Sequence, residues 1–206
     1  MALKKTEIKH NDNLMEFYNL EECLDFFEEQ KDIAKKHYAL EKMVEFSEGS
    51  KELLKIMINN ESDKNLISFI SSLLAKVDPK IAPIEELLEA MKIENAYLRN
   101  HVISILQDYG KEIKYYIVKY LIGDDRDLRI FAINVLGDVK FPESREMMLE
   151  LLQKEDDVNV AMTAVDYLQE IGQIEDIPII EKLKSKFKNE PYVEFAVNNA
   201  IKMIKA

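Results

Sequence analysis

The feature that most constrains the fold is an apolar stripe that recurs along the chain at a nearly constant interval. Leu128, Ala132, Val135, Leu136 and Val139 fall within an arc of roughly 80° on a helical wheel, so they mark one face of an α-helix. Steps of 32, 30, 32 and 32 residues carry this stripe from residue 66 to residue 203. The equivalent sets are Leu66, Ile70, Leu73, Leu74 and Val77, then Leu98, Val102, Ile105, Leu106 and Tyr109, then Val160, Ala164, Tyr167, Leu168 and Ile171, then Tyr192, Ala196, Asn199, Ala200 and Met203. A sixth helix is expected near residues 31–46, through Ala39 and Met43.

Another apolar-faced segment precedes each striped helix. These segments read "LEECLDFF", "ELLKIMI", "PIEELLEAM", "YYIVKYLI", "REMMLELLQ" and "PIIEKLKSKF". Asp127, Asp157 and Asn189 suit N-cap positions between the two helices of a pair. A single hairpin cannot bury its stripe, so neighbouring hairpins must stack. The sequence therefore predicts an all-α fold, an α-solenoid of about six stacked helical hairpins over residues 20–206, after an N-terminal cap or partly ordered segment at residues 1–19.

Composition agrees with helices and narrows the class of partner. Five glycines and five prolines are few for a protein built from antiparallel sheets, which need many tight turns. The formal charge of −11 disfavours binding to nucleic-acid phosphates or anionic lipid. No apolar run approaches the roughly 18 residues of a membrane span, and no signal peptide is evident, so we expect a cytoplasmic protein without a membrane partner.

The segment "DRDLRIFAINVLGDVKFPE" resembles the HEAT repeat, in particular the short bacterial form of phycobilisome lyase-like proteins. The matching residues are Asp127, Leu128, Arg129, Ala132, Leu136 and Gly137. "ENAYLRNHVISILQDYG" is similar through Leu98, Arg99, Val102 and Leu106, whereas Ala161 and Val193 replace the arginine in the last two units. The resemblance implies an α-solenoid whose second helices line a concave surface. Because the repeat motif reflects how the helices pack, it is fairly specific for the fold and poorly specific for function.

One column of residues lies at the flank of the apolar stripe and is the first candidate site. Phe131 occupies it, and the equivalent residues are His37, Phe69, His101, Thr163 and Phe195. The column has two interpretations: packing between adjacent repeats, or an aromatic ladder that grips a partner helix or peptide. In the second interpretation Phe69, His101, Phe131 and Phe195 supply contact area, and Asn134, Asp166 and Asn198 supply polar selectivity.

Charged residues give a second set of candidates. Arg99 and Arg129 are expected to form ion pairs across repeats with Asp127 and Asp157, with a clamp on a carboxylate or phosphate as the alternative. Acidic runs such as "EECLDFFEEQKD" fit a solvated face or a surface that recognises a basic partner.

The sequence predicts no enzyme. His37 and Glu41 stand one helical turn apart, but two ligands do not make a metal site. The chain has no Gly-rich phosphate loop, no nucleophile elbow and no His-Glu dipeptide of the kind that holds iron in HEAT-type hydroxylases. We therefore expect no catalytic residues, no metal and no cofactor.

The leading hypothesis is a non-catalytic adaptor or scaffold that binds a protein or peptide partner in its concave face. The lyase resemblance leaves an alternative, a factor that attaches or removes a bilin or aids another maturation step. A HEAT protein that binds nucleic acid is the third hypothesis, and the charge of −11 speaks against it.

Overall fold

The computed structural model describes residues 15–139 and 141–206, and all regular structure in these residues is helical. The chain divides into two compact units, residues 1–49 and residues 50–206, with the division at the start of α3. We call them unit 1 and unit 2 and describe each by itself.

Unit 1 contains one helical hairpin, α1 (Leu20–Glu29) and α2 (Ile33–Met43). Each helix has a side-chain N-cap: Asn19 accepts from an amide of the first turn of α1, and Asp32 does so for α2. The core of the hairpin consists of Cys23, Phe27, Ala39, Leu40 and Met43. The predicted sixth striped helix is confirmed as α2, because Ala39 and Met43 are fully buried.

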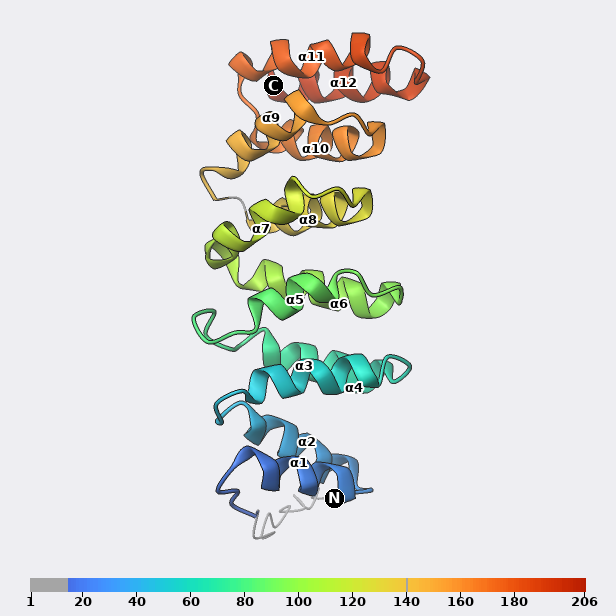
Figure 1. The fold of residues 1–206 in the computed structure, drawn as a ribbon. Coiled ribbons are helices and arrows are strands. Elements are labelled where there is room, and N and C mark those ends of the chain that lie inside the picture. The colour runs from blue at the N-terminus through green and yellow to red at the C-terminus, as the bar shows by residue number, and fades with distance from the viewer. Residues whose placement is uncertain (1–14, 140) are drawn as a thin grey trace, which may run out of the picture. The chain divides into compact units, whose positions relative to one another are not determined.

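Unit 2 contains five further hairpins, each a first helix followed by a second helix. The pairs are α3 (Gly49–Asn59) with α4 (Lys64–Leu74), α5 (Ile84–Ala90) with α6 (Ala96–Asp108), α7 (Lys114–Leu121) with α8 (Arg126–Val139), α9 (Ser144–Lys154) with α10 (Val158–Ile171), and α11 (Ile177–Lys186) with α12 (Pro191–Ile204). Short 3₁₀ helices, η1 (Gly110–Ile113) and η2 (Ile174–Asp176), lead into α7 and α11. Figure 1 shows these pairs of unit 2 as successive layers.

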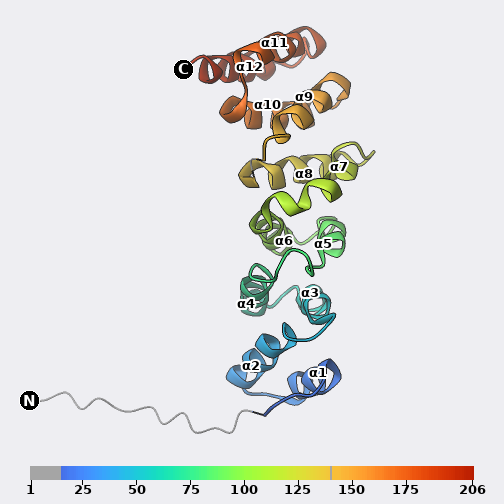
Figure 2. The same cartoon turned by 90° about the vertical axis from the view of Figure 1, so that its left-hand side faces the viewer.

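The second helices of unit 2 pack on one another in chain order, α4 on α6, α6 on α8, α8 on α10 and α10 on α12. The first helices lie on the other side of each layer, where α5 contacts α7 and α9 contacts α11. Figure 2 shows the two rows of unit 2 from the side. The described helices confirm an all-α fold, with five stacked hairpins that form an α-solenoid in unit 2 and one hairpin in unit 1.

The predicted apolar stripes form the core of unit 2. Leu98, Val102, Ile105 and Leu106 of α6 are fully or almost fully buried, and Leu128, Ala132, Val135 and Leu136 of α8 are also buried. The prediction is wrong by one residue in α12, where Val193, Val197 and Ala200 are buried while Tyr192, Asn199 and Met203 are exposed. α12 packs on α10 and α11, so the contact with these two helices sets which of its faces is covered.

Short polar side chains cap most of the second helices. Asp63 caps α4, Asn95 caps α6 and Asp157 caps α10, the last as predicted. The predicted caps at Asp127 and Asn189 are wrong. Asp125 accepts the amides of Asp127 and Leu128 at 2.9 and 3.1 Å, so α8 begins earlier than the stripe suggested. α12 begins at Pro191 behind Glu190, without a side-chain cap.

The proposed division at residue 19 stays a prediction. Residues 1–14 lie outside the described residues, and α1 begins at Leu20.

Candidate functional site

The row of second helices in unit 2 presents one continuous exposed surface, which we call the second-helix face. Its residues come from the solvent side of α4, α6, α8, α10 and α12. Because the repeats have nearly equal length and their second helices pack side by side, equivalent residues line up across the layers. Residues at equivalent positions of successive repeats therefore lie in a row on the surface.

The predicted aromatic column runs along this face at intermediate depth. Phe69, His101, Phe131 and Thr163 are each partly buried, so the structure places them between the core and the solvent. Phe195, on the last second helix, is 77% exposed. The column thus contributes to packing between helices and also leaves ring surface accessible to a partner.

The predicted polar residues lie beside the aromatic column, one helical turn further along. Asn134, Asp166 and Asn198 are exposed, and so are Ser72 and Ser104 at the equivalent positions of α4 and α6. The backbone carbonyl of Asn134 accepts a hydrogen bond of 2.9 Å from Nε2 of Gln107 on the neighbouring helix. The backbone at Asn134 in α8 is therefore hydrogen-bonded to α6, the second helix of the preceding hairpin.

The two rows of helices differ in the side chains that they expose. On the first helices these are mainly long charged residues, among them Glu85, Glu86, Glu89, Lys119, Glu146, Glu150, Lys154, Glu181, Lys182 and Lys186. On the second-helix face they are mainly short polar residues, among them Asn65, Ser68, Ser72, Asn100, Ser104, Asn134, Asn159, Asn198 and Asn199. Protein interfaces are depleted of Lys and Glu, and antibody paratopes combine aromatic residues with Ser and Asn. The second-helix face has this interface-like composition.

Contacts within and across the layers hold aromatic rings of this face in place. The hydroxyls of Ser68 and Tyr97 lie 2.8 Å apart, and the Tyr97 ring meets the His101 ring edge-on at 4.8 Å between centroids. The guanidinium of Arg99 lies 4.5 Å from the centre of the Phe131 ring. Such contacts reduce the rotamer entropy that a binding surface would lose on meeting a partner.

Two titratable side chains on the second-helix face have shifted pKa values. Burial lowers the pKa of His101 below its usual value, because the charged imidazolium would lose hydration there. Burial also raises the pKa of Asp166, because a carboxylate in the same kind of environment loses hydration.

The predicted partners of the two arginines need correction. Arg129 does form an ion pair across repeats, but with Glu155 and not with Asp157, at 2.8 and 3.0 Å. The Asp157 carboxylate instead caps α10. Arg99 donates to the carbonyl of Ile93 at 2.8 Å and stacks on Phe131. The exposed carboxylate of Asp127 lies 3.2 Å from Arg126 in the same turn, so neither predicted aspartate serves as the inter-repeat partner that the structure shows.

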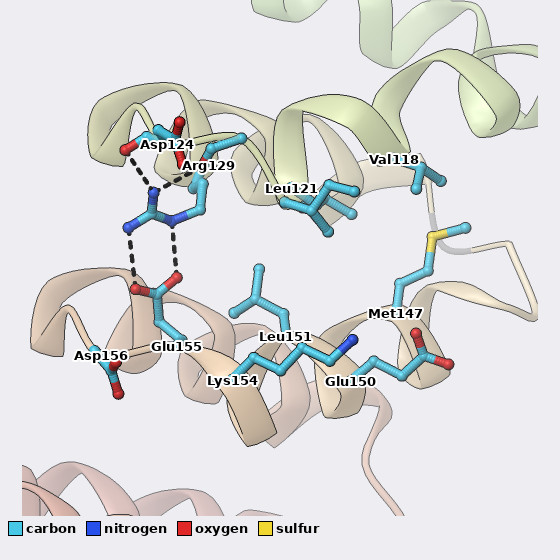
Figure 3. A pocket seen from close by; sticks show the side chains of 12 residues that line it. Val118, Leu121, Asp124, Arg129, Met147, Glu150, Leu151, Lys154, Glu155 and Asp156 are labelled. Carbon is cyan, nitrogen blue, oxygen red and sulfur yellow. Dashed lines mark hydrogen bonds and ion pairs between the residues drawn. The ribbon is translucent and has the colours of Figure 1, made fainter.

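A groove between α7 and α9, on the first-helix side, was not predicted from the sequence. It has a volume of about 360 Å³, and we call it the α7–α9 groove. Its lining residues are Val118, Leu121, Ile122, Gly123, Asp124, Arg129, Met147, Glu150, Leu151, Lys154, Glu155 and Asp156. Figure 3 shows Val118 and Met147 toward one end and the Arg129–Glu155 ion pair at the other. The sequence carries no signal for it, because the exposure of Val118 and Ile122 is known only from the structure.

Within residues 15–139 and 141–206, no group of three or more His, Cys, Asp or Glu side chains has an arrangement that could hold a metal ion. In the same residues, no helix has the length and apolar character needed to cross a membrane.

A family model and a solved structure are similar to this chain. Residues 116–190, which run from within α7 to the residue before α12, match the family model described as HEAT repeats. An engineered protein solved by the Northeast Structural Genomics Consortium is similar to this chain at 16% sequence identity and a TM-score of 0.41, over 90% of this chain and 96% of the engineered one. No curated protein matches the chain. The match over residues 116–190 supports HEAT repeats in this part of unit 2, in agreement with the resemblance in the sequence.

Proposed function

We propose that the chain is a non-catalytic interaction module that binds a protein or peptide partner on its second-helix face. HEAT repeats commonly serve as protein-interaction scaffolds, and residues 116–190 of unit 2 match such repeats. The observation that carries the proposal is the contrast between the two rows: Lys and Glu dominate the exposed first helices, whereas Asn, Ser and partly exposed aromatic rings dominate the second.

The proposed contact residues are Phe69, His101, Phe131 and Phe195, with Asn134, Asp166 and Asn198 as the polar group beside them. The aromatic side chains offer a large contact area. Tyr97 and Arg99 hold the rings of His101 and Phe131, which lowers the conformational entropy that these two residues would lose on binding. The adjacent amides and hydroxyls supply hydrogen bonds that select among apolar partners.

The charge of this face supports a partner with a basic surface. Asp108, Asp138, Asp166, Glu170 and Glu194 are exposed on it, against Lys64, Arg126 and Lys202. With a formal charge of −11 over the whole chain, a basic partner would associate faster at low ionic strength.

Affinity capture from native lysate with matched variants tests the proposal. Phe195→Ser removes an exposed ring from the second-helix face, and Tyr115→Ser removes a ring of similar exposure, 85%, from α7. The proposal predicts that at least one partner recovered by wild type and by Tyr115→Ser is depleted about tenfold with Phe195→Ser. If Phe195→Ser, Asn134→Ala and Asp166→Asn all recover the same partners as wild type, the second-helix face is not the binding surface.

A further inference from the structure

The α7–α9 groove has an apolar floor that two helices form together. Leu121 of α7 and Leu151 of α9 are almost fully buried, while Val118 and Ile122 are 38% and 72% exposed. Val118 of α7 and Ile122, the residue that directly follows this helix, are four residues apart, and the Ile122 amide still donates to the Val118 carbonyl at 3.3 Å. Met147 and Leu151 are four residues apart on α9. Residues at this spacing share a helix face, so each helix contributes an apolar row along the groove.

The Arg129–Glu155 ion pair closes one end of this groove, as Figure 3 shows. Both carboxylate oxygens of Glu155 are bound to Arg129, and Nη1 of Arg129 donates to the carbonyls of Gly123 and Asp124 at 2.8 and 3.0 Å. Because these acceptors occupy four of the five N–H donors of the guanidinium, Arg129 is poorly placed to bind a phosphate or a carboxylate from a ligand in a bidentate manner.

The remaining charges at the rim are mainly negative. Asp124, Glu150 and Asp156 stand around the groove with a single lysine, Lys154. Asp156 also meets Lys186 at 2.9 Å, but its side chain is 91% exposed, so water screens that pair strongly. An apolar floor with an acidic rim is complementary to apolar side chains that are flanked by Lys or Arg.

We infer that the α7–α9 groove is a second interaction site, which takes an amphipathic helical segment of a protein partner with aliphatic side chains flanked by lysine or arginine. The volume of about 360 Å³ accommodates a few aliphatic side chains, and the two apolar rows run along the groove as a helix face requires. This site lies on the first-helix side of unit 2 and does not depend on the second-helix face.

A pair of synthetic helical peptides of about 15 residues tests the inference on the full chain. The first peptide carries Leu at positions i, i+4 and i+7 with Lys on both flanks, and the second replaces every Lys with Glu. Fluorescence anisotropy is expected to show binding of the Leu/Lys peptide, which weakens as salt is added, and at least tenfold weaker binding of the Leu/Glu peptide. The absence of Leu/Lys binding, or equal binding of both peptides, overturns the inference.

Matched variants locate the binding on the protein. Ile122→Ser changes an exposed residue of the groove, and Ile81→Ser changes a residue with the same exposure, 72%, in the loop between α4 and α5. The dissociation constant is expected to rise about tenfold for Ile122→Ser and to stay unchanged for Ile81→Ser. Equal effects of the two variants overturn the inference.

The variant Phe195→Ser distinguishes peptide binding in the α7–α9 groove from peptide binding on the second-helix face. It leaves the peptide affinity unchanged if the groove is the binding site. A loss of peptide affinity with Phe195→Ser, and not with Ile122→Ser, contradicts the inference and supports the function proposed for the second-helix face.

Discussion

Arg129 and Glu155 join neighbouring repeats through two parallel hydrogen bonds. Nε of Arg129 lies 2.8 Å from Oε2 of Glu155, and Nη2 lies 3.0 Å from Oε1. The side chains are 15% and 5% exposed, so this pair is the better shielded counterpart of the exposed Arg126–Asp127 contact. Loss of one partner would leave the other charge in a site with little water.

Glu155→Ala is therefore expected to lower the free energy of unfolding by about 3 kcal/mol, because Arg129 then keeps its burial without its anion. Asp127→Ala, which breaks the exposed pair, is expected to change it by less than about 1 kcal/mol. Urea denaturation monitored by circular dichroism measures both. Equal effects for the two variants would show that the Arg129–Glu155 pair adds nothing beyond a surface contact.

Two glycines are expected to respond to alanine in opposite directions. A Cβ added at Gly137, inside α8, meets no atom within 4 Å, so Gly137→Ala is expected to stabilise the protein by about 0.5–1 kcal/mol. A Cβ at Gly172 would lie 2.5 Å from the carbonyl oxygen of Leu168 and 2.8 Å from Cδ1 of Ile204. Gly172→Ala should therefore destabilise it, by about 1–3 kcal/mol. Thermal unfolding of the two variants checks the signs, and a lower melting temperature for Gly137→Ala would count against the described packing of α8.

Cys23 is expected to react slowly with thiol reagents in the native protein. Its side chain is fully buried, Sγ donates to the carbonyl of Ala39 at 3.1 Å, and burial raises the pKa of the thiol to about 11. Because the thiolate is the nucleophile, labelling by a disulfide reagent near pH 8 should be slow in buffer and fast in denaturant. Rapid stoichiometric labelling of the folded chain would show that the α1–α2 hairpin is open.

His101 should make stability depend on pH. Its pKa is lowered by burial, so the folded state binds a proton less readily than the unfolded state does. The neutral imidazole is present in both states above the unfolded pKa near 6.5, and stability is lost as the pH falls below that value. Between about pH 7.5 and pH 5.5, wild type is expected to lose more unfolding free energy than His101→Gln does. An identical pH dependence for the two proteins contradicts this prediction.

The sequence predicted the repeats because their main signal is periodic. A stripe that recurs every 30 or 32 residues identifies both the helices and the faces that they bury, as α6 and α8 show. The prediction from the stripe failed at α12. There the contacts with α10 and α11 bury a helix face that begins at Val193, one residue after the predicted Tyr192.

The contacts between side chains were less predictable. Asp157 was expected to pair with Arg129, yet an aspartate just before a helix competes for the amides of the first turn, and here it caps α10. Glu155, two residues earlier, has the longer side chain and forms the ion pair with Arg129. The α7–α9 groove could not be predicted at all, because it depends on the spacing between first helices in three dimensions.

Amide hydrogen exchange of the full chain, with and without a captured partner, tests the central claim most directly. The proposed function predicts that the partner slows exchange in the second helices, mainly in α6, α8, α10 and α12, whether or not α7 and α9 are also protected through the α7–α9 groove. Protection in α7 and α9 with none in the second helices would contradict it.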